Sequence, residues 1–273
     1  MHLLKELETQ IFLWEIDMNF VGTAVTDIGI VKKTNQDSVC IKTANTEKLG
    51  QIAMVVLCDG MGGLEKGELA SAVAIRAFLD WFDNELPKLL TRLNWRTFST
   101  EWEKLIKEQN YRISQYGKTV DVTLGTTVTA MLVIGGKYLI AHVGDSRVYQ
   151  LTDKIIQLTE DQTFIAREIK KGTMTAEQAA KDPRRNMLLQ CVGASRNVEP
   201  QMLTGVIKED TVFMFCSDGF RHVLSDEEMY ESFNPTNATN AITMEQNSRY
   251  LIDVVKSRKE RDNITVALLK CTK

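Results

Sequence analysis

Cysteine, proline and histidine are scarce in this chain. Five cysteines, four prolines and three histidines occur among 273 residues. The cysteines form no CxxC pair and have no regular spacing, which argues against a disulfide framework and against a zinc site. They lie mostly in or beside apolar runs, as small buried hydrophobic residues do; these are Cys40, Cys58, Cys191 and Cys216. No proline-rich or low-complexity linker divides the chain, so we expect one main domain.

The chain also lacks a large net charge and a long hydrophobic run. Its 33 basic and 36 acidic residues leave a formal charge of −3. Basic residues cluster only in pairs such as Lys32–Lys33, too sparsely to neutralise the phosphates of a nucleic acid. No apolar run approaches the roughly 20 residues that span a bilayer. We therefore expect a cytoplasmic protein that binds neither nucleic acid nor membrane.

Residues 1–20 form a predicted N-terminal extension. Leu4, Leu7, Ile11 and Trp14 recur at steps of three and four residues, which indicates one apolar stripe on a helix. This segment can be a helix docked on the domain, a disordered leader, or a helix that binds a partner or dimerises, and the sequence leaves these alternatives open.

Residues 21–273 alternate between predicted strands and helices. Short apolar runs ended by turn residues predict strands at Ile52–Cys58, Thr126–Ile134, Tyr138–Val143, Val148–Leu151, Thr211–Cys216 and Ile264–Leu269. Helical periodicity is present at about 68–84, 97–116, 226–233 and 238–257. In the first helix the expected inward residues are Leu69, Val73, Ala77 and Phe78, and in the second they are Trp102, Leu105, Ile106 and Ile113. This order favours a layered α+β domain.

Residues 159–193 differ from their surroundings. They are charged, contain two short helical segments and separate two groups of strands. We interpret them as a flap inserted into the domain.

Aspartates recur at the ends of the apolar runs. Asp59, Asp145 and Asp218 each follow such a run and precede a small residue, and Asp262 begins the run from Ile264. An isolated Asp-Gly pair is more often a simple turn. Several carboxylates at the ends of buried strands, however, need compensation, and hard oxygen ligands suit Mg²⁺ or Mn²⁺. After Asp59, the glycines Gly60, Gly62 and Gly63 allow a backbone carbonyl to turn toward a ligand.

The chain resembles the metal-dependent protein phosphatase family, also called protein phosphatase 2C, and in particular its bacterial stand-alone branch. The resemblance covers about residues 21–270. Its motifs occur in family order: Thr26-Asp-Ile-Gly-Ile-Val-Lys-Lys-Thr-Asn-Gln-Asp37-Ser, Cys58-Asp-Gly-Met-Gly-Gly, Leu124-Gly-Thr-Thr, His142-Val-Gly-Asp-Ser-Arg147, Leu158-Thr-Glu-Asp-Gln-Thr163, Ser217-Asp-Gly-Phe and Asp262-Asn-Ile-Thr-Val266. Each motif alone is weak, but seven in order are a strong signal.

The resemblance implies a four-layer αββα sandwich, with two central, mostly antiparallel sheets and two Mn²⁺ or Mg²⁺ ions at one edge. By position, Asp59 would bridge the two metals, and the Gly60 carbonyl, Asp218 and Asp262 would complete their ligands. Asp37 would act through a metal-bound water, and Asp145 would help to bind a possible third metal. Catalysis is thus assigned to Asp37, Asp59, Asp218 and Asp262. The flap would border the substrate groove.

The implied activity is a protein serine/threonine phosphatase. Two cations roughly 3.5–4 Å apart can activate water near neutral pH and neutralise the phosphoryl oxygens. We expect direct attack by that water, because no Cys-x5-Arg loop suggests a covalent route. The expected partners are phosphorylated proteins that a Ser/Thr kinase has modified, and the enzyme is expected to be a monomer.

Three positions depart from the pattern of the family. Lys32 stands where the family has a phosphate-binding arginine, and lysine keeps the charge but loses the bidentate fork. The neighbouring Lys33 is an alternative phosphate ligand. Gln36 replaces a glutamate that is common in relatives, and Met61 stands where many eukaryotic relatives carry a histidine acid. His142 is interpreted as a core or groove histidine, whereas His222 gives no functional signal.

Other functions remain alternatives at this point. Lys32 and Gln36 leave open a catalytically impaired, phosphatase-like binding module. A two-metal nuclease is disfavoured by the near-neutral charge, and a phosphatase dedicated to one regulatory partner is disfavoured by the flap.

Overall fold

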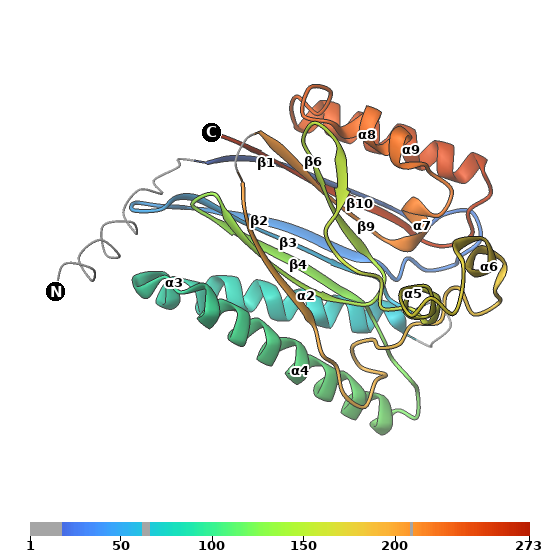
Figure 1. Cartoon of the computed structure of the whole chain (residues 1–273). Coiled ribbons are helices and arrows are strands. Elements are labelled where there is room, and N and C mark those ends of the chain that lie inside the picture. The colour runs from blue at the N-terminus through green and yellow to red at the C-terminus, as the bar shows by residue number, and fades with distance from the viewer. Residues whose placement is uncertain (1–17, 62–65, 208–209) are drawn as a thin grey trace.

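Two β-sheets pack face to face between two layers of helices. The computed structural model describes residues 18–61, 66–207 and 210–273. The sheets occupy the centre, with α2 and α4 on one side and α8 and α9 on the other (Figure 1). The prediction of a four-layer αββα sandwich is confirmed. The predicted helix near the N-terminus falls outside the described residues, and strand β1 begins at Asn19.

The first sheet joins the two ends of the described chain. All its strand pairs are antiparallel. Its order is β1 (Asn19–Asp27), β10 (Ile264–Thr272), β9 (Thr211–Cys216), β6 (Arg147–Leu151) and β7 (Ile155–Gln157).

The second sheet is also antiparallel throughout. Its order is β2 (Ser38–Thr46), β3 (Gly50–Cys58), β4 (Val128–Ile134), β5 (Lys137–Val143) and β8 (Gln201–Val206). Each strand predicted from an apolar run is present, and each lies in the interior of its sheet. The four strands that the apolar runs did not predict are β1, β2, β7 and β8, which are the sheet edges.

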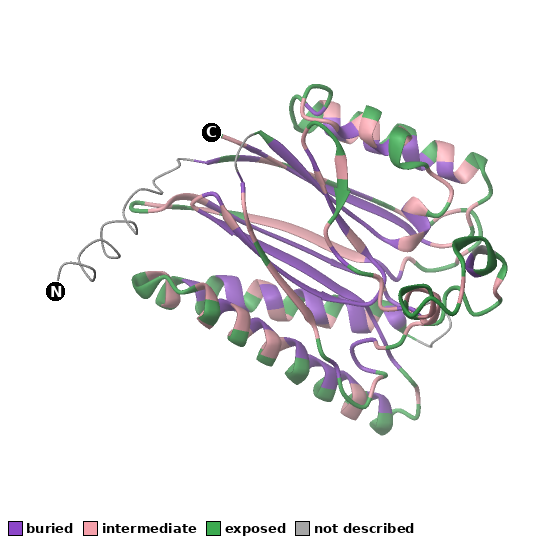
Figure 2. Ribbon diagram, viewed as in Figure 1, coloured by how far each residue is buried: buried purple, intermediate pink, exposed green. Residues whose placement is uncertain are grey.

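Strand β3 shows why the interior strands are continuously apolar. Successive side chains of a strand point to opposite faces of the sheet. Ala53, Val55 and Leu57 pack in the cluster between the two sheets, with Phe213 and Leu269 of the other sheet. The alternating side chains pack against the helices instead, at Ile52, Met54, Val56 and Cys58. Both faces of β3 are therefore buried, as the buried central layers in Figure 2 show.

The outer helices cover the two sheets. The second sheet is covered by α2 (Gly67–Asn84), α3 (Leu86–Leu89), the 3₁₀ helix η2 (Leu90–Arg92) and α4 (Trp95–Thr119). The first sheet is covered by α7 (Asp218–Arg221), α8 (Asp226–Phe233) and α9 (Ala241–Ser257). In the described part of the chain, no helix combines the length and the apolar character needed to cross a bilayer.

The predicted inward face of α2 is partly wrong. Phe78 is buried as expected, but Leu69, Val73 and Ala77 are only half-buried. The core instead receives the neighbouring stripe of Ala70, Ala74, Phe78 and Trp81. The stripe is rotated because α4 packs beside α2 and contributes Trp102, which contacts Phe78 and Trp81 edge to face. In α4, Trp102, Ile106 and Ile113 are buried as predicted, whereas Leu105 is half-buried.

The flap contains two short helices, α5 (Phe164–Lys170) and α6 (Ala176–Lys181). Both begin with a threonine whose hydroxyl accepts a backbone N–H of the first turn. Asp161 ties the start of the flap to β6, since it accepts Nε and Nη2 of Arg147, both at 2.7 Å. The flap therefore has a fixed root at the first sheet.

The aromatic contact between α2 and α4 is expected to contribute to the free energy of unfolding. Trp102→Ala should lower the free energy of unfolding by about 3–5 kcal/mol, because it removes a fully buried indole and leaves a cavity. Tyr111→Ala on the same helix is the control, since Tyr111 is 66% exposed, and it should change stability by less than about 0.5 kcal/mol. Urea denaturation measures both, and equal effects would contradict this account of the packing.

Because His142 of β5 is buried, we expect the protein to lose stability in acid. It is buried, its Nδ1 lies 3.0 Å from Thr129 Oγ1, and burial lowers its pKa from 6.5 to about 4. Between these pH values the His142 imidazole is protonated in the unfolded chain but neutral in the folded chain, so stability falls as the pH falls. The loss should reach about 3 kcal/mol by about pH 4.

Denaturation at several pH values should therefore show a steeper acid loss for the parent than for His142→Gln, which has no proton to bind. Parallel pH profiles would exclude this role for His142.

Candidate functional site

Asp59 lies at the end of β3, and its backbone is fixed to the start of β4. Its N–H donates to Thr127 Oγ1 at 2.9 Å, and its carbonyl accepts Thr127 N at 2.8 Å. The next residue, Gly60, donates its N–H to Gln36 O at 3.1 Å. A Cβ on Gly60 would lie 2.4 Å from that oxygen and 2.5 Å from Gly67 O, so only glycine fits between these two backbone segments.

Asp218 and Asp262 come together because β9 and β10 are antiparallel neighbours. Asp218 follows β9 and Asp262 precedes β10, so both lie at the same end of the first sheet. Ser217 N donates to Thr265 O at 3.0 Å and holds the two strand ends together. A side chain on Gly219 would come within 2.1 Å of Asn263 O, which makes this approach specific for glycine.

Asp37 and Asp145 lie where the chain passes from one sheet to the other. Asp37 connects β1 to β2, and Asp145 connects β5 to β6. Both are buried. Thr265 Oγ1 donates to Asp37 Oδ2 at 2.6 Å, so β10 of the first sheet positions a carboxylate that leads into the second.

Electrostatic interactions connect all five aspartates. Burial, followed by the charges of Asp37, Asp218, Asp145 and Asp262, raises the pKa of Asp59 well above its usual range. Burial, together with Asp218 and Asp262, raises the pKa of Asp37 to about 7 despite the hydrogen bond from Thr265. Burial and the charge of Asp218 likewise raise the pKa of Asp145 to about 7. The carboxylates therefore oppose one another's ionisation, and a divalent cation among them would relieve that repulsion.

The five carboxylates surround one region without meeting at a single point. Among residues 18–61, 66–207 and 210–273, no three His, Cys, Asp or Glu side chains are close enough together to hold an ion. One reason lies at Asp262, whose Oδ1 is 2.6 Å from Lys32 Nζ. Lys32 thus compensates a predicted metal ligand, while its neighbour Lys33 is exposed and does not line the cleft.

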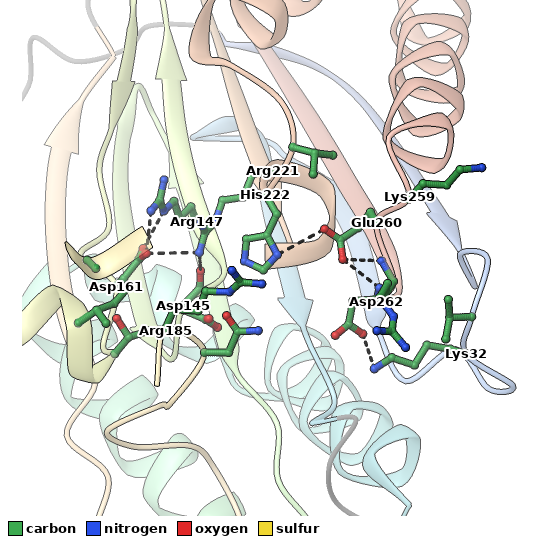
Figure 3. A pocket seen from close by; sticks show the side chains of 17 residues that line it. Lys32, Asp145, Arg147, Asp161, Arg185, Arg221, His222, Lys259, Glu260 and Asp262 are labelled. Carbon is green, nitrogen blue, oxygen red and sulfur yellow. Dashed lines mark hydrogen bonds and ion pairs between the residues drawn. The ribbon is translucent and has the colours of Figure 1, made fainter. Parts of the chain in front are cut away.

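Two of the five aspartates border a cleft of about 780 Å³. Asp145 and Asp262 line it, and Lys32 projects into it beside Asp262 (Figure 3). Asp37, Asp59 and Asp218 are not among the lining residues. The flap contributes Arg185 and Asn186 to the same cleft, which fits the prediction that residues 159–193 border a groove.

The sequence did not reveal two cationic side chains of this cleft, Arg221 and His222. His222, to which the sequence assigned no functional signal, lines this cleft. Arg221 Nη2 contacts Asp161 Oδ2 at 3.3 Å and Asp145 O at 3.0 Å. His222 lies 3.6 Å from both Asp218 and Glu260, and these carboxylates raise its pKa although burial opposes this. Helix α7 is the missed signal, because residues three and four positions after Asp218 lie on the same face of a helix.

Gln36 and Met61, two positions that depart from the family pattern, are structural here. Gln36 is buried, its N–H donates to Asn263 Oδ1 at 2.9 Å, and its side-chain amide lies 3.3 Å from Glu68 Oε2. Met61 N donates to Gly125 O at 3.0 Å. Glu68 therefore places a carboxylate next to the side chain of Gln36.

The donor set suits hard divalent cations. Mg²⁺ and Mn²⁺ favour carboxylate and carbonyl oxygens, and neither cysteine nor histidine dominates this cleft. Backbone hydrogen bonds at the strand ends hold the segments that carry these aspartates in place.

The chain matches known proteins over most of its length. The family model "Protein phosphatase 2C" matches residues 30–254. The serine/threonine phosphatase stp of Listeria monocytogenes serotype 4b is 30% identical over 248 residues, covering 90% of this chain and 93% of that protein.

Solved structures agree with this match. The serine/threonine phosphatase of S. agalactiae has a TM-score of 0.78 and 29% identity, covering 92% of this chain and 99% of that one. The catalytic domain of the serine threonine protein phosphatase PstP, solved in complex with two manganese ions, has a TM-score of 0.75 and 26% identity, covering 94% of this chain and 100% of that one. With the sandwich and the converging aspartates, these matches establish that the chain belongs to the protein phosphatase 2C family.

Proposed function

We propose that this protein hydrolyses phosphoserine and phosphothreonine in other proteins with the help of two divalent cations, Mn²⁺ or Mg²⁺. The observation that carries the proposal is the convergence of four aspartate charges on Asp59. Asp59, the Gly60 carbonyl, Asp218 and Asp262 would hold the two ions, and Asp37 would hold a water bound to one of them. Asp145 would contribute to a third ion.

Two such cations, held by these residues, would supply a lowered pKa for a water molecule and positive charge for the phosphoryl oxygens. The chain's own residues supply the orientation. Lys32, beside Asp262, would bind a phosphoryl oxygen. Thr265 holds Asp37 in place, and Arg147 and Arg221 hold Asp161 at the root of the flap.

The relatives support catalysis over the alternative of an impaired binding module, because those with the same fold are named as serine/threonine phosphatases. Their names support phosphorylated proteins as substrates. A Ser/Thr kinase as the opposing enzyme, a cytoplasmic location and a monomeric state are further parts of the proposal.

Metal dependence provides the first test. Hydrolysis of a phosphothreonine peptide should require Mn²⁺ or Mg²⁺ and stop on addition of EDTA. Asp218→Asn should lower kcat by at least about 100-fold, since even groups that only orient metal ligands contribute about 10- to 100-fold.

Asp253→Asn is the matched control, because Asp253 is exposed on α9 and has no partner in the described part of the chain. It should retain the parent rate. Full activity in EDTA, or in Asp218→Asn, would refute the proposed metal site.

Lys32 provides a second prediction. Lys32→Met should raise KM for a phosphopeptide by about 10-fold or more, because a hydrogen bond to a charged group contributes about 1.5–3 kcal/mol. The apparent affinity for Mn²⁺ should not fall, because the substitution also removes a cation from Asp262. Lys32→Arg should restore KM or improve it, since arginine binds phosphate through two parallel hydrogen bonds.

Lys33→Met is the control for this experiment, since its side chain is exposed outside the cleft. A larger rise in KM for Lys33→Met than for Lys32→Met would assign phosphate binding to Lys33.

A further inference from the structure

The cations of the cleft fall into two groups. Most already face a carboxylate: Lys32 faces Asp262, Arg147 and Arg221 face Asp161, and His222 faces Glu260. Lys259 and Arg261, which lie on one loop, also line the cleft, as does Arg185 of the flap, and all three are exposed. Within the described ranges, the side chains of these three residues have no hydrogen-bond or ion-pair partner. Their charges are therefore available to a ligand.

The loop that carries Lys259 and Arg261 is firmly held. It connects α9 to β10, and Glu260 lies between the two cations. The Glu260 carboxylate accepts Arg261 N at 2.6 Å and Asp262 N at 3.1 Å, and it lies 3.6 Å from His222 Nδ1. Figure 3 shows Glu260 turned toward His222, whereas the side chain of Lys259 extends away from the other labelled residues. The hydrogen bonds of Glu260 thus fix the backbone that carries Lys259 and Arg261.

The backbone of Lys259 gives an independent indication. Its φ is +67°, in the left-handed region that follows many helices and favours glycine. A lysine at this position is strained, and strain of this kind persists at functional sites more often than elsewhere. The chain keeps a long cationic side chain where glycine would be the more stable choice.

The position of Lys259 and Arg261 indicates what they bind. Lys259 and Arg261 are close in sequence to Asp262, beside which the target phosphate is proposed to bind. The cleft of 780 Å³ is much larger than one phosphate group, so parts of the substrate next to that group must also occupy it. The overall charge of −3 excludes a generally basic surface, so the rim is a local feature.

We propose that Lys259 and Arg261 form a cationic rim that selects phosphopeptides with negative charge next to the phosphorylated residue. This inference rests on the proposed phosphatase function. Acidic side chains and a second phosphate group are two sources of the same chemistry. The rim would attract either without taking part in the chemical step, so its effect would lie in kcat/KM and would weaken as salt screens the charges.

The test compares phosphothreonine peptides that differ only in their flanks, with glutamate, glutamine, lysine or a second phosphoserine beside the target residue. The flank-free p-nitrophenyl phosphate is measured in parallel with Mn²⁺. The glutamate peptide should exceed the glutamine peptide in kcat/KM by about 3- to 10-fold at low salt, as expected for two partly screened ion pairs. A gain with the second phosphate group alone would identify that group as the source.

Two variants and a control assign the preference to the rim. Lys259→Gly with Arg261→Gln should reduce the preference to less than about two-fold. Lys259→Gly by itself should melt at the parent temperature or above, because glycine relieves the left-handed strain. Lys154→Gln removes an exposed cation at the β6–β7 turn, away from the cleft, and should keep the full preference.

Equal turnover of all flanked peptides, or a preference that persists in the double variant, would overturn the cationic rim while the phosphatase assignment stands. Failure to hydrolyse both p-nitrophenyl phosphate and every peptide would overturn the proposed function itself, and the rim with it.

Discussion

Electrostatic repulsion among five buried or half-buried aspartates is the constraint on which this structure depends. Burial first, and then the charges of neighbouring carboxylates, raise the pKa values of Asp37, Asp59 and Asp145, so the carboxylates oppose one another's ionisation. A chain would not bring these groups together without anchors that outweigh the repulsion. The anchors are backbone hydrogen bonds at the sheet ends and the close approaches that glycine permits at Gly60 and Gly219. A binding site for cations follows from a fold that holds anions together.

The sandwich supplies these anchors through its connectivity. Antiparallel pairing puts the end of β9 beside the start of β10, and the passages between the sheets add further aspartates at the same end. Opposite charges then complete the cleft. Lys32 faces Asp262, while Arg147 and Arg221 share Asp161 and tie the flap to the first sheet. The charges that hold the fold and those of the proposed site are therefore parts of one network, and the cations Lys259 and Arg261 at its rim have no ion-pair partner in the part of the chain that the structure describes.

The sequence predicts correctly those strands that are buried on both faces. Strands such as β3 and β9, buried on both faces, read as unbroken apolar runs and were predicted. Edge strands such as β2 mix polar and apolar residues, have no fully buried residue and were missed. On α2 the period was right but the buried stripe was rotated toward Ala70 and Trp81, because the position of α4 decides which face is covered. Periodicity identifies a helix, but the packing of the neighbouring helix decides which side faces the core.

The sequence by itself determined the fold class, the family resemblance and the residue types of the candidate site, because apolar runs, turn glycines and their terminal aspartates are local features. Only the tertiary structure decided which charges are neighbours. Loops packed against one another in space decide that Lys32 faces Asp262 and that His222 lies between Asp218 and Glu260. They also decide that Lys259 and Arg261 have no ion-pair partner among the described residues. Electrostatic interaction depends on distance and burial, and neither is encoded in the order of residues near any one charge.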